Sequence, residues 1–388
     1  MSSYELALDP SLVYVPISSA TLSLVVVMSK RWHGKLTFDT EAGAQKFHTT
    51  PTPRVGGIAL FGSLFVAWLL VGNLTGGLLG AMLIAGLPAF IAGLFEDLTK
   101  RVGVRERLVA TMISGFLASM LTGYRLDFID IPSFDHWLAL APVAVAFTAF
   151  AVGGVANAIN IIDGFNGLAG AVLMVCFGMM GLIAYQVGDL QLVSICLLAT
   201  LSVAGFMLLN FPFGKIFMGD GGAYFMGFML AWTAVMLPMR NPSVSPWASV
   251  VICSYPIIET LFSIWRKANR KGYNPGQPDR VHFHMLVYQR VSRSVFFDHG
   301  ASLVNGMTTL FILPFSLMCS LSGLLFYSST SLLAGSMVIN FAVYYLIYLR
   351  LTQFRWCLRP ATSTAHAYNR RFEVQLDALL YQLVNALD

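Results

Sequence analysis

Long apolar stretches without charged side chains alternate along the chain with shorter segments that carry nearly all of the charges. Each stretch approaches the ~20 apolar residues that a helix needs to cross a bilayer. The stretches lie near 12–29, 55–72, 77–95, 108–123, 137–156, 167–187, 190–209, 222–238, 247–265, 301–324 and 329–349. The pattern predicts an all-α, polytopic membrane protein with about eleven transmembrane helices.

Composition supports this class and excludes others. Of the 388 residues, 56% are hydrophobic and only 11% are charged, whereas soluble domains have about 25% charged residues. The five cysteines are far apart and form no Cys-x-x-Cys pair, so neither a zinc site nor a disulfide framework is predicted. The expected surroundings are a lipid bilayer, and no nucleic-acid partner is predicted.

The charges also predict an orientation. If the spans alternate in direction, the linkers divide into two sets, and of the 24 Lys and Arg residues only Arg125 and Arg240 fall in the set that contains the N-terminus. Basic residues concentrate in cytoplasmic loops. The N-terminus is therefore expected outside the cytoplasm, and the C-terminus inside it.

The C-terminal region differs from the rest. Residues 368–387 place leucines and a phenylalanine at helical spacing, with charged residues between them, which predicts an amphipathic helix. Such a helix suits the membrane surface or a contact between subunits, so a homodimer is left open. We expect one membrane domain at 1–350 and a cytoplasmic tail at 351–388.

Segments with chemical character all fall in the set of linkers expected in the cytoplasm. They lie at 45–57, 96–107, 157–167, 215–222 and 266–295. The first combines Lys46, Thr52, prolines and glycines, which suits a phosphate or pyrophosphate, although an ordinary basic linker explains it too. In the second, adjacent Glu96 and Asp97 end an apolar stretch. They predict a divalent-metal or polar site, or alternatively a solvated charge cluster.

The third segment places polar side chains at three-residue spacing, which brings them to roughly one face of a helix end. They are Asn157, Asn160, Asp163 and Asn166. Asparagine and aspartate supply the oxygen ligands that Mg²⁺ or a nucleotide requires. Helix capping explains one or two of them. In the fourth segment, Asp220 lies among glycines, and it either caps the next helix or approaches a metal or phosphate.

The fifth segment contains Arg280, His282 and His284. The spacing of the histidines, without a cysteine or a third close histidine, argues against zinc, while arginine and histidine suit a diphosphate. A solvated basic loop is the alternative. Glu259 is the one acid well inside an apolar stretch, which makes it a functional hypothesis, with support of another residue or helix pairing as its expected role.

Taken in order, these segments resemble the polyprenyl-phosphate N-acetylhexosamine-1-phosphate transferase family, also known as glycosyltransferase family 4. The resemblance covers about residues 45–295. The family includes the phospho-MurNAc-pentapeptide translocases and the undecaprenyl-phosphate GlcNAc-1-phosphate transferases. The chain departs from the common pattern at three positions, and the histidine loop favours the GlcNAc-type branch. These departures are Glu96 and Asn166, where the family usually has Asp, and Met285, where many relatives have His.

The resemblance implies transfer of a sugar 1-phosphate from a UDP-sugar to undecaprenyl phosphate in a bacterial inner membrane. It implies Asp220 and Asp163 as ligands of Mg²⁺, with Mn²⁺ as an alternative ion, and Asp97 or Glu96 as helpers of the lipid phosphate. Asp163 is also a candidate catalytic residue, because Asp97 and Asp163 are the only acids suited to be nucleophiles.

Substrate binding is expected from the remaining polar side chains of the five segments. They are Lys46, Thr52, Asn157, Asn160, Asn166, Arg280, His282 and His284. Two other functions compete with the enzyme. A secondary transporter of an anionic solute requires polar residues near the middle of the bilayer, and a non-catalytic scaffold would explain Glu96 and Asn166 as losses.

Overall fold

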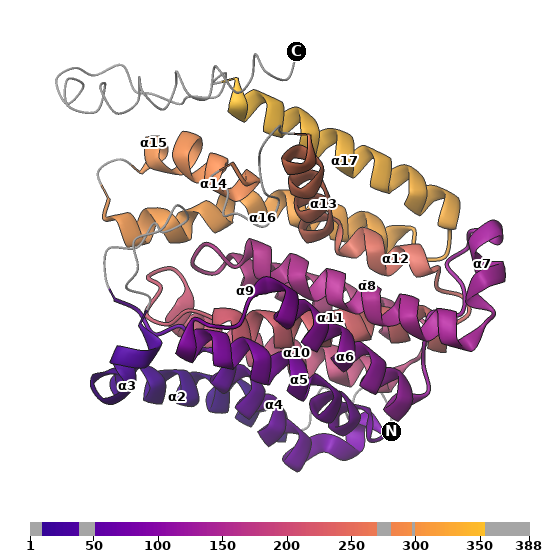
Figure 1. The fold of residues 1–388 in the computed structure, drawn as a ribbon, viewed down its shortest axis with the longest axis horizontal. Coiled ribbons are helices and arrows are strands. Elements are labelled where there is room, and N and C mark those ends of the chain that lie inside the picture. The colour runs from indigo at the N-terminus through magenta and orange to yellow at the C-terminus, as the bar shows by residue number, and fades with distance from the viewer. Residues whose placement is uncertain (1–9, 39–50, 270–280, 297–298, 354–388) are drawn as a thin grey trace.

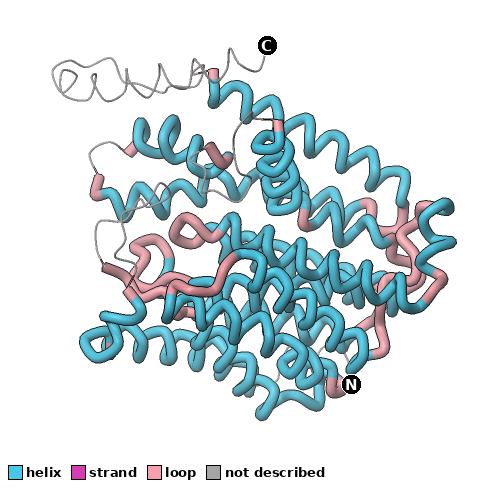
Figure 2. The backbone as a smooth tube through the Cα atoms, viewed as in Figure 1, coloured by secondary structure: helices cyan, strands magenta, loops and turns pink. Residues whose placement is uncertain are grey.

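The computed structural model describes residues 10–38, 51–269, 281–296 and 299–353. Secondary structure in these ranges is helical apart from one isolated bridge between Phe38 and Pro53 (Figure 2). The amphipathic tail predicted at 368–387, together with Lys46 and Arg280, lies outside the described residues. The predictions about these parts of the chain therefore stay predictions.

The apolar stretches of the sequence coincide with helices, most of which lie roughly parallel to one another (Figure 1). The α-helices are α2 (Tyr14–Met28), α3 (Lys30–Thr37), α4 (Gly57–Val71), α5 (Leu78–Thr99), α6 (Val104–Thr122), α7 (Pro132–Leu138), α8 (Ala141–Ile162), α9 (Leu168–Gln186), α10 (Leu190–Asn210), α11 (Gly219–Arg240), α12 (Pro246–Ile252), α13 (Ser254–Ala268), α14 (Phe283–Val287), α15 (Arg293–Val295), α16 (Ala301–Leu325) and α17 (Thr330–Thr352). Short 3-10 turns form η1 (Pro10–Val13) and η2 (Gly72–Thr75), and a π-helical turn forms η3 (Tyr288–Ser292).

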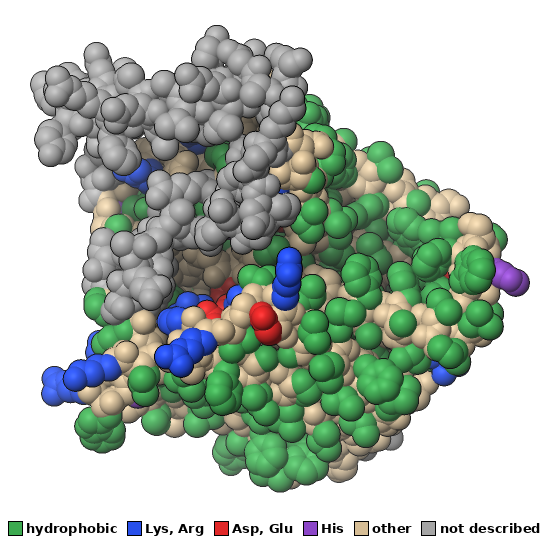
Figure 3. Space-filling model, viewed as in Figure 1, with side chains coloured by type: hydrophobic (Ala, Val, Ile, Leu, Met, Phe, Trp, Pro, Cys, Tyr) green, Lys and Arg blue, Asp and Glu red, His purple; other side chains and the backbone are tan. Residues whose placement is uncertain are grey.

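Within the described residues, nine helices are long and apolar enough to cross a membrane, and the bent pair α12–α13 makes a tenth if it is one span. The expected class, an all-α polytopic membrane protein, is confirmed. The expected count of about eleven also included the apolar stretch at 108–123, which corresponds to α6. The first turn of α6 carries Arg105, Glu106 and Arg107, and α6 is not among the nine helices. Hydrophobic side chains are spread over the lower and right parts of the face shown in Figure 3.

Helix α11 forms the centre of the bundle, and 89% of its 18-residue apolar segment is buried. Small residues let its neighbours approach closely. A Cβ on Gly227 would lie 2.7 Å from Cα of Ala156 on α8, and one on Gly93 of α5 would lie 2.5 Å from the backbone of Asp220. Because contacts this close exclude any side chain, α5 and α8 are held against the N-terminal end of α11.

The pair α12–α13 bends by 77° at Cys253. Proline has no backbone N–H, so Pro256 cannot donate to the carbonyl of Ile252 four residues earlier. The hydroxyl of Ser320 on α16 donates to this carbonyl instead, at 2.8 Å. The bend therefore has an identifiable cause, and it directs α13 toward the end of the molecule where α14 lies (Figure 1).

The linkers divide between the two ends of the bundle as the alternation of spans predicts. At one end, the guanidinium of Arg240 donates to Asp189 at 2.7 and 2.9 Å and to the hydroxyl of Tyr124 at 2.9 Å. Thr330 donates to Asp130 at the same end. These residues belong to or adjoin the linkers expected outside the cytoplasm. The segments with chemical character meet at the opposite end, near α3 and α14.

Candidate active site

The first and fourth segments of the sequence pair through their backbones. The N–H of Gly56 donates to the carbonyl of Phe217 at 3.0 Å, and that of Gly57 donates to Met218 at 2.9 Å. A Cβ on Gly57 would lie 2.4 Å from the backbone nitrogen of Gly222. Glycines at these positions therefore allow the loop before α4 to lie directly on the start of α11.

Asp97, in the last turn of α5, caps α11. Its carboxylate accepts hydrogen bonds from the N–H groups of Asp220 and Gly221 at 2.9 and 2.8 Å. It also pairs with Nε of Arg54 at 3.2 Å, and its side chain is fully buried. A carboxylate at a helix N-terminus satisfies unpaired N–H groups and opposes the positive end of the helix dipole. Asp97 therefore fixes the position of the first turn of α11.

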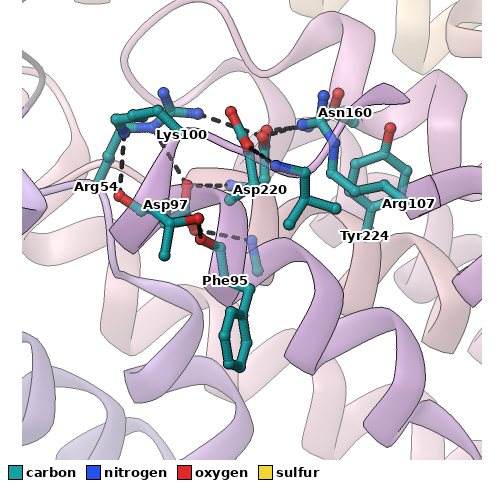
Figure 4. A network of polar contacts seen from close by, with 12 residues as sticks. Arg54, Phe95, Asp97, Lys100, Arg107, Asn160, Asp220 and Tyr224 are labelled. Atoms are coloured by element: carbon teal, nitrogen blue, oxygen red, sulfur yellow. Dashed lines mark hydrogen bonds and ion pairs between the residues drawn. The ribbon is translucent and has the colours of Figure 1, made fainter. Parts of the chain in front are cut away.

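The side chain of Asp220 lies at the centre of the polar network in Figure 4. Its Oδ1 accepts a hydrogen bond from the amide of Asn160 at 2.7 Å. Its Oδ2 pairs with the guanidinium of Arg107 on α6, and Arg54 approaches the same oxygen at 3.5 Å. Two cations and an amide from three separate segments thus converge on one carboxylate.

A second layer of contacts holds α6, α8 and α11 together beside this carboxylate. The guanidinium of Arg107 lies over the ring of Tyr224, 5.5 Å from its centroid. The hydroxyl of Tyr224 donates to the amide oxygen of Asn157 at 3.1 Å. Asn157 and Asn160, three residues apart on α8, therefore share the face that meets α11, as their spacing predicts.

Asp163 follows the last residue of α8 and shares this charged environment. Burial raises the pKa of its carboxyl well above its usual range, the Asp220 carboxylate raises it further, and the Arg54 guanidinium opposes the rise. Asp97 adds to the repulsion. Three carboxyl groups that are distant in the sequence thus lie near one another, and the other two disfavour ionisation of Asp163.

Glu96 and Asp97 are neighbours in the sequence, but their side chains have different partners. Oε2 of Glu96 accepts a hydrogen bond from the N–H of Val102 at 2.8 Å, so this carboxylate supports the loop that follows its own helix. Nζ of Lys100 donates to the carbonyl of Asp97 at 3.0 Å. These contacts therefore place Asp97, rather than Glu96, against Asp220.

Asn166 connects three segments behind the site. Its N–H donates to Oδ1 of Asn305 at 2.7 Å, and its amide nitrogen donates to the carbonyls of Pro212 and Ser302 at 3.0 and 3.3 Å. Thr309 donates to its carbonyl at 2.8 Å. The residue is 1% exposed. An amide provides the two donors that these carbonyls require, and a carboxylate does not.

Asn166→Asp is expected to destabilise the protein, because a carboxylate would face two carbonyl oxygens without a proton to donate. We expect a loss of about 2 kcal/mol, the usual cost of leaving buried polar groups unpaired, measured as a lower melting temperature in detergent. Asn73→Asp, at an exposed residue of η2, serves as the control for the same change in chemistry. Equal melting temperatures for Asn166→Asp and wild type would contradict the structural role.

The histidine loop lies against the turn that follows Asp163. The rings of His282 and His284 stack with centroids 5.3 Å apart and planes 3° apart, and His284 meets Phe165 edge-on at 5.5 Å. A Cβ on Gly164 would lie 3.5 Å from Nε2 of His284. Burial lowers the pKa of His284 to about 3, Glu259 opposes this, and His282 adds to it. His284 is therefore neutral near pH 7.

The structure brings most of the predicted site residues to this end of the bundle. Asp97, Asp163, Asp220 and the two asparagines of α8 form one network, with the histidines beside it. Thr52 is buried next to the loop that covers α11. Sequence reasoning missed Arg107, although it lies two residues beyond a cluster of basic residues at the start of an apolar stretch.

The donor set suits a magnesium ion in its chemistry. Carboxylate and amide oxygens are the ligands that Mg²⁺ prefers, and the mutual repulsion of the three aspartates favours a cation among them. Among the described residues, no three His, Cys, Asp or Glu side chains lie close enough to form a complete protein-only site. A magnesium ion at this place would therefore take most of its ligands from water and substrate phosphates.

Fold and site together define a membrane-embedded protein with an acidic, arginine-lined cluster at one end of its helices. The sequence profile of glycosyl transferase family 4 matches residues 79–238. The chain is 27% identical over 299 residues to the undecaprenyl-phosphate alpha-N-acetylglucosaminyl 1-phosphate transferase of Yersinia pestis, covering 75% of this chain and 80% of that protein.

Two other relatives agree. The probable undecaprenyl-phosphate N-acetylglucosaminyl 1-phosphate transferase of Bacillus subtilis is 27% identical, covering 69% of this chain and 74% of the relative. The alpha-N-acetylglucosaminyl enzyme of Escherichia coli K12 is 28% identical, covering 65% and 70%. The family profile and these relatives support the resemblance to glycosyl transferase family 4 that was drawn from the motifs.

Proposed function

We propose that the protein transfers an N-acetylhexosamine 1-phosphate, most simply GlcNAc 1-phosphate, from a UDP-sugar to undecaprenyl phosphate. The products are UMP and a lipid-diphosphate-linked sugar, which would initiate synthesis of a cell-surface polysaccharide. The observation that carries the proposal is the cluster of Asp97, Asp163 and Asp220 with Arg54 and Arg107 at one end of an apolar bundle. The names of the relatives support the same reaction.

The place of the cluster favours a transferase over a secondary transporter. Transporters bind their solutes near the middle of the bilayer, between broken helices. Here the network joins the last turn of α5, the end of α8 and the first turn of α11. A lipid phosphate at the membrane surface and a water-soluble nucleotide meet naturally at such a place, which we assign to the cytoplasmic face of a bacterial inner membrane.

In this proposal, Asp220 and Asp163 hold Mg²⁺, and Asn160 orients Asp220 through its amide. When bound, the ion neutralises the phosphate oxygens of donor and acceptor, whose repulsion otherwise opposes reaction. Arg54 and Arg107 are placed to bind phosphate oxygens as well as Asp220, because guanidinium groups match phosphate geometry. Lys46 and Arg280, outside the described residues, remain proposed contacts of the diphosphate, and Thr52 and Asn157 of the substrates.

The function is tested with the purified protein in detergent, undecaprenyl phosphate, Mg²⁺ and a panel of UDP-sugars that includes UDP-GlcNAc and UDP-GalNAc. We expect release of UMP from at least one donor, dependent on both the lipid and the metal ion, because the lipid phosphate is the proposed nucleophile. UMP is measured by chromatography, and reactions without the lipid are the control. Absence of UMP with every donor would overturn the proposed reaction.

A further inference from the structure

A buried carboxylate on α13 holds the histidine loop. Oε1 of Glu259 contacts Nδ1 of His282 at 2.7 Å, and its two oxygens accept the N–H of Phe283 at 3.3 and 3.2 Å. The hydroxyl of Tyr344 on α17 donates to Oε2 at 2.8 Å. Glu259 is 1% exposed. A buried charge is tolerated only when it is paired and hydrogen-bonded, and here the contacts with His282 and Phe283 fasten the loop to the bundle.

The carboxylate determines which nitrogen of His282 is available to a ligand. With Nδ1 donating its proton to Glu259, the ring has one assigned orientation, and Nε2 is the nitrogen left for another partner. When both ring nitrogens carry a proton, the Nε2–H can donate to an oxygen acceptor. An imidazole fixed in this way loses little rotational freedom when it binds, which favours affinity. Carboxylate partners fix metal-binding histidines in proteins by the same contact.

The stacked histidines connect Glu259 to the turn that follows Asp163. His284 lies between His282 and Phe165, and its Nδ1 is buried without a hydrogen-bond partner among the described residues. Packing therefore holds this ring in place. Because Gly164 and Phe165 follow Asp163 directly, a displacement of His282 would reach the turn that contains Asp163.

We propose that Glu259, supported by Tyr344, is a positioning residue that holds His282 by Nδ1 so that, when both ring nitrogens carry a proton, the Nε2–H donates to a phosphate oxygen of a nucleoside diphosphate. The inference rests on the proposed function only for the identity of the ligand. Glu259 itself touches neither the substrate nor the aspartate cluster in this arrangement. Of its contacts with the loop, the one with His282 orients the nitrogen proposed to bind the ligand, and the dependence on His282 can be measured.

The test is a double-mutant cycle on UDP binding by the full-length protein in detergent, measured by calorimetry. Glu259→Gln is expected to weaken UDP binding about tenfold, the usual scale for a lost charge-assisted hydrogen bond. His282→Gln is expected to weaken it at least as much. Because Glu259 acts through His282, adding Glu259→Gln to His282→Gln should change affinity by less than about twofold. Independent, multiplicative effects would overturn the inference, as would wild-type affinity in Glu259→Gln.

Two buried tyrosines supply a matched comparison if Glu259→Gln does not fold. Tyr344→Phe removes a hydrogen bond to Glu259, whereas Tyr255→Phe removes a hydroxyl that has no partner among the described residues, beside the same Phe283 ring. We expect Tyr344→Phe to weaken UDP binding about threefold and Tyr255→Phe to leave it unchanged. Equal affinities in the two variants would overturn the inference.

Failure of the proposed function gives a different result from failure of this inference. The same preparations are assayed for UMP release with undecaprenyl phosphate. If wild type binds UDP but releases UMP from no donor, the transferase function fails, while the cycle on UDP affinity still decides the role of Glu259. If wild type releases UMP and the cycle is multiplicative, the function stands and the positioning role is rejected.

Discussion

Asp220→Asn is expected to lower the rate of UMP release by about a thousandfold, at the upper range for loss of one electrostatic group in an active site. The Asp220 carboxylate accepts a hydrogen bond from Asn160 and forms ion pairs with Arg54 and Arg107. An amide has nearly the same size but no charge. It would weaken the proposed metal site and remove the counterion of Arg107, whereas Arg54 would keep its pairing with Asp97.

This effect is measured as UMP release under saturating donor and lipid, together with Mg²⁺ titration of the rate. Asp127→Asn is the matched control, because Asp127 pairs with Arg125 and is half exposed. The control should retain wild-type activity. A folded Asp220→Asn variant with more than about a tenth of wild-type activity would contradict the assignment of Asp220, since electrostatic groups in active sites contribute far more.

Sequence reasoning located the helices and the end of the bundle where the polar segments meet. Both follow from strong physical constraints: a bilayer requires uncharged stretches of fixed length, and backbone polar groups inside it must be satisfied within helices. Asn157 and Asn160 could also be placed on one face of α8, because side chains three residues apart on a helix point to roughly the same side. The single π-helical turn at Tyr288–Ser292 and the bend at Cys253 had no such signal.

Contacts between distant segments could not be predicted from spacing. Glu96 and Asp97 are adjacent acids in the sequence, yet one supports the loop at Val102 and the other caps α11. Successive residues on a helix point about 100° apart, so only the position of α11 separates their roles. Glu259 is 85 residues from Tyr344, and the sequence pattern left its role as support or helix pairing undecided.

The departure at Asn166 shows how a missing carboxylate can be misinterpreted from sequence. Measured against the family pattern, Asn166 suggested a weakened active site or a scaffold without activity. In the structure, its amide donates to two carbonyls and its backbone is held by Asn305 and Thr309. These contacts support an architectural role for the amide, so the substitution by itself is no argument for lost activity.

Asp97→Asn is expected to damage stability and activity together, because Asp97 both caps α11 and neutralises Arg54. An asparagine side chain would turn one of its acceptors into a donor facing a backbone N–H. We expect a loss of about 3 kcal/mol in stability, the upper range for a buried unpaired polar group. UMP release is expected to fall about a hundredfold, because the first turn of α11 carries Asp220 and small misplacements of catalytic groups cost this much.

The paired variant Glu96→Gln separates this explanation from direct catalysis. Its amide oxygen can still accept the N–H of Val102, so we expect activity within about threefold of wild type and an unchanged melting temperature, as for most partly exposed substitutions. Melting temperatures are measured in detergent without ligands, and UMP release with saturating substrates. A loss of activity in Asp97→Asn without any change in melting temperature would reject the capping role and favour direct action on the lipid phosphate. A joint loss of activity and melting temperature in Asp97→Asn, with both retained in Glu96→Gln, is expected if Asp97 acts by holding Asp220 in place.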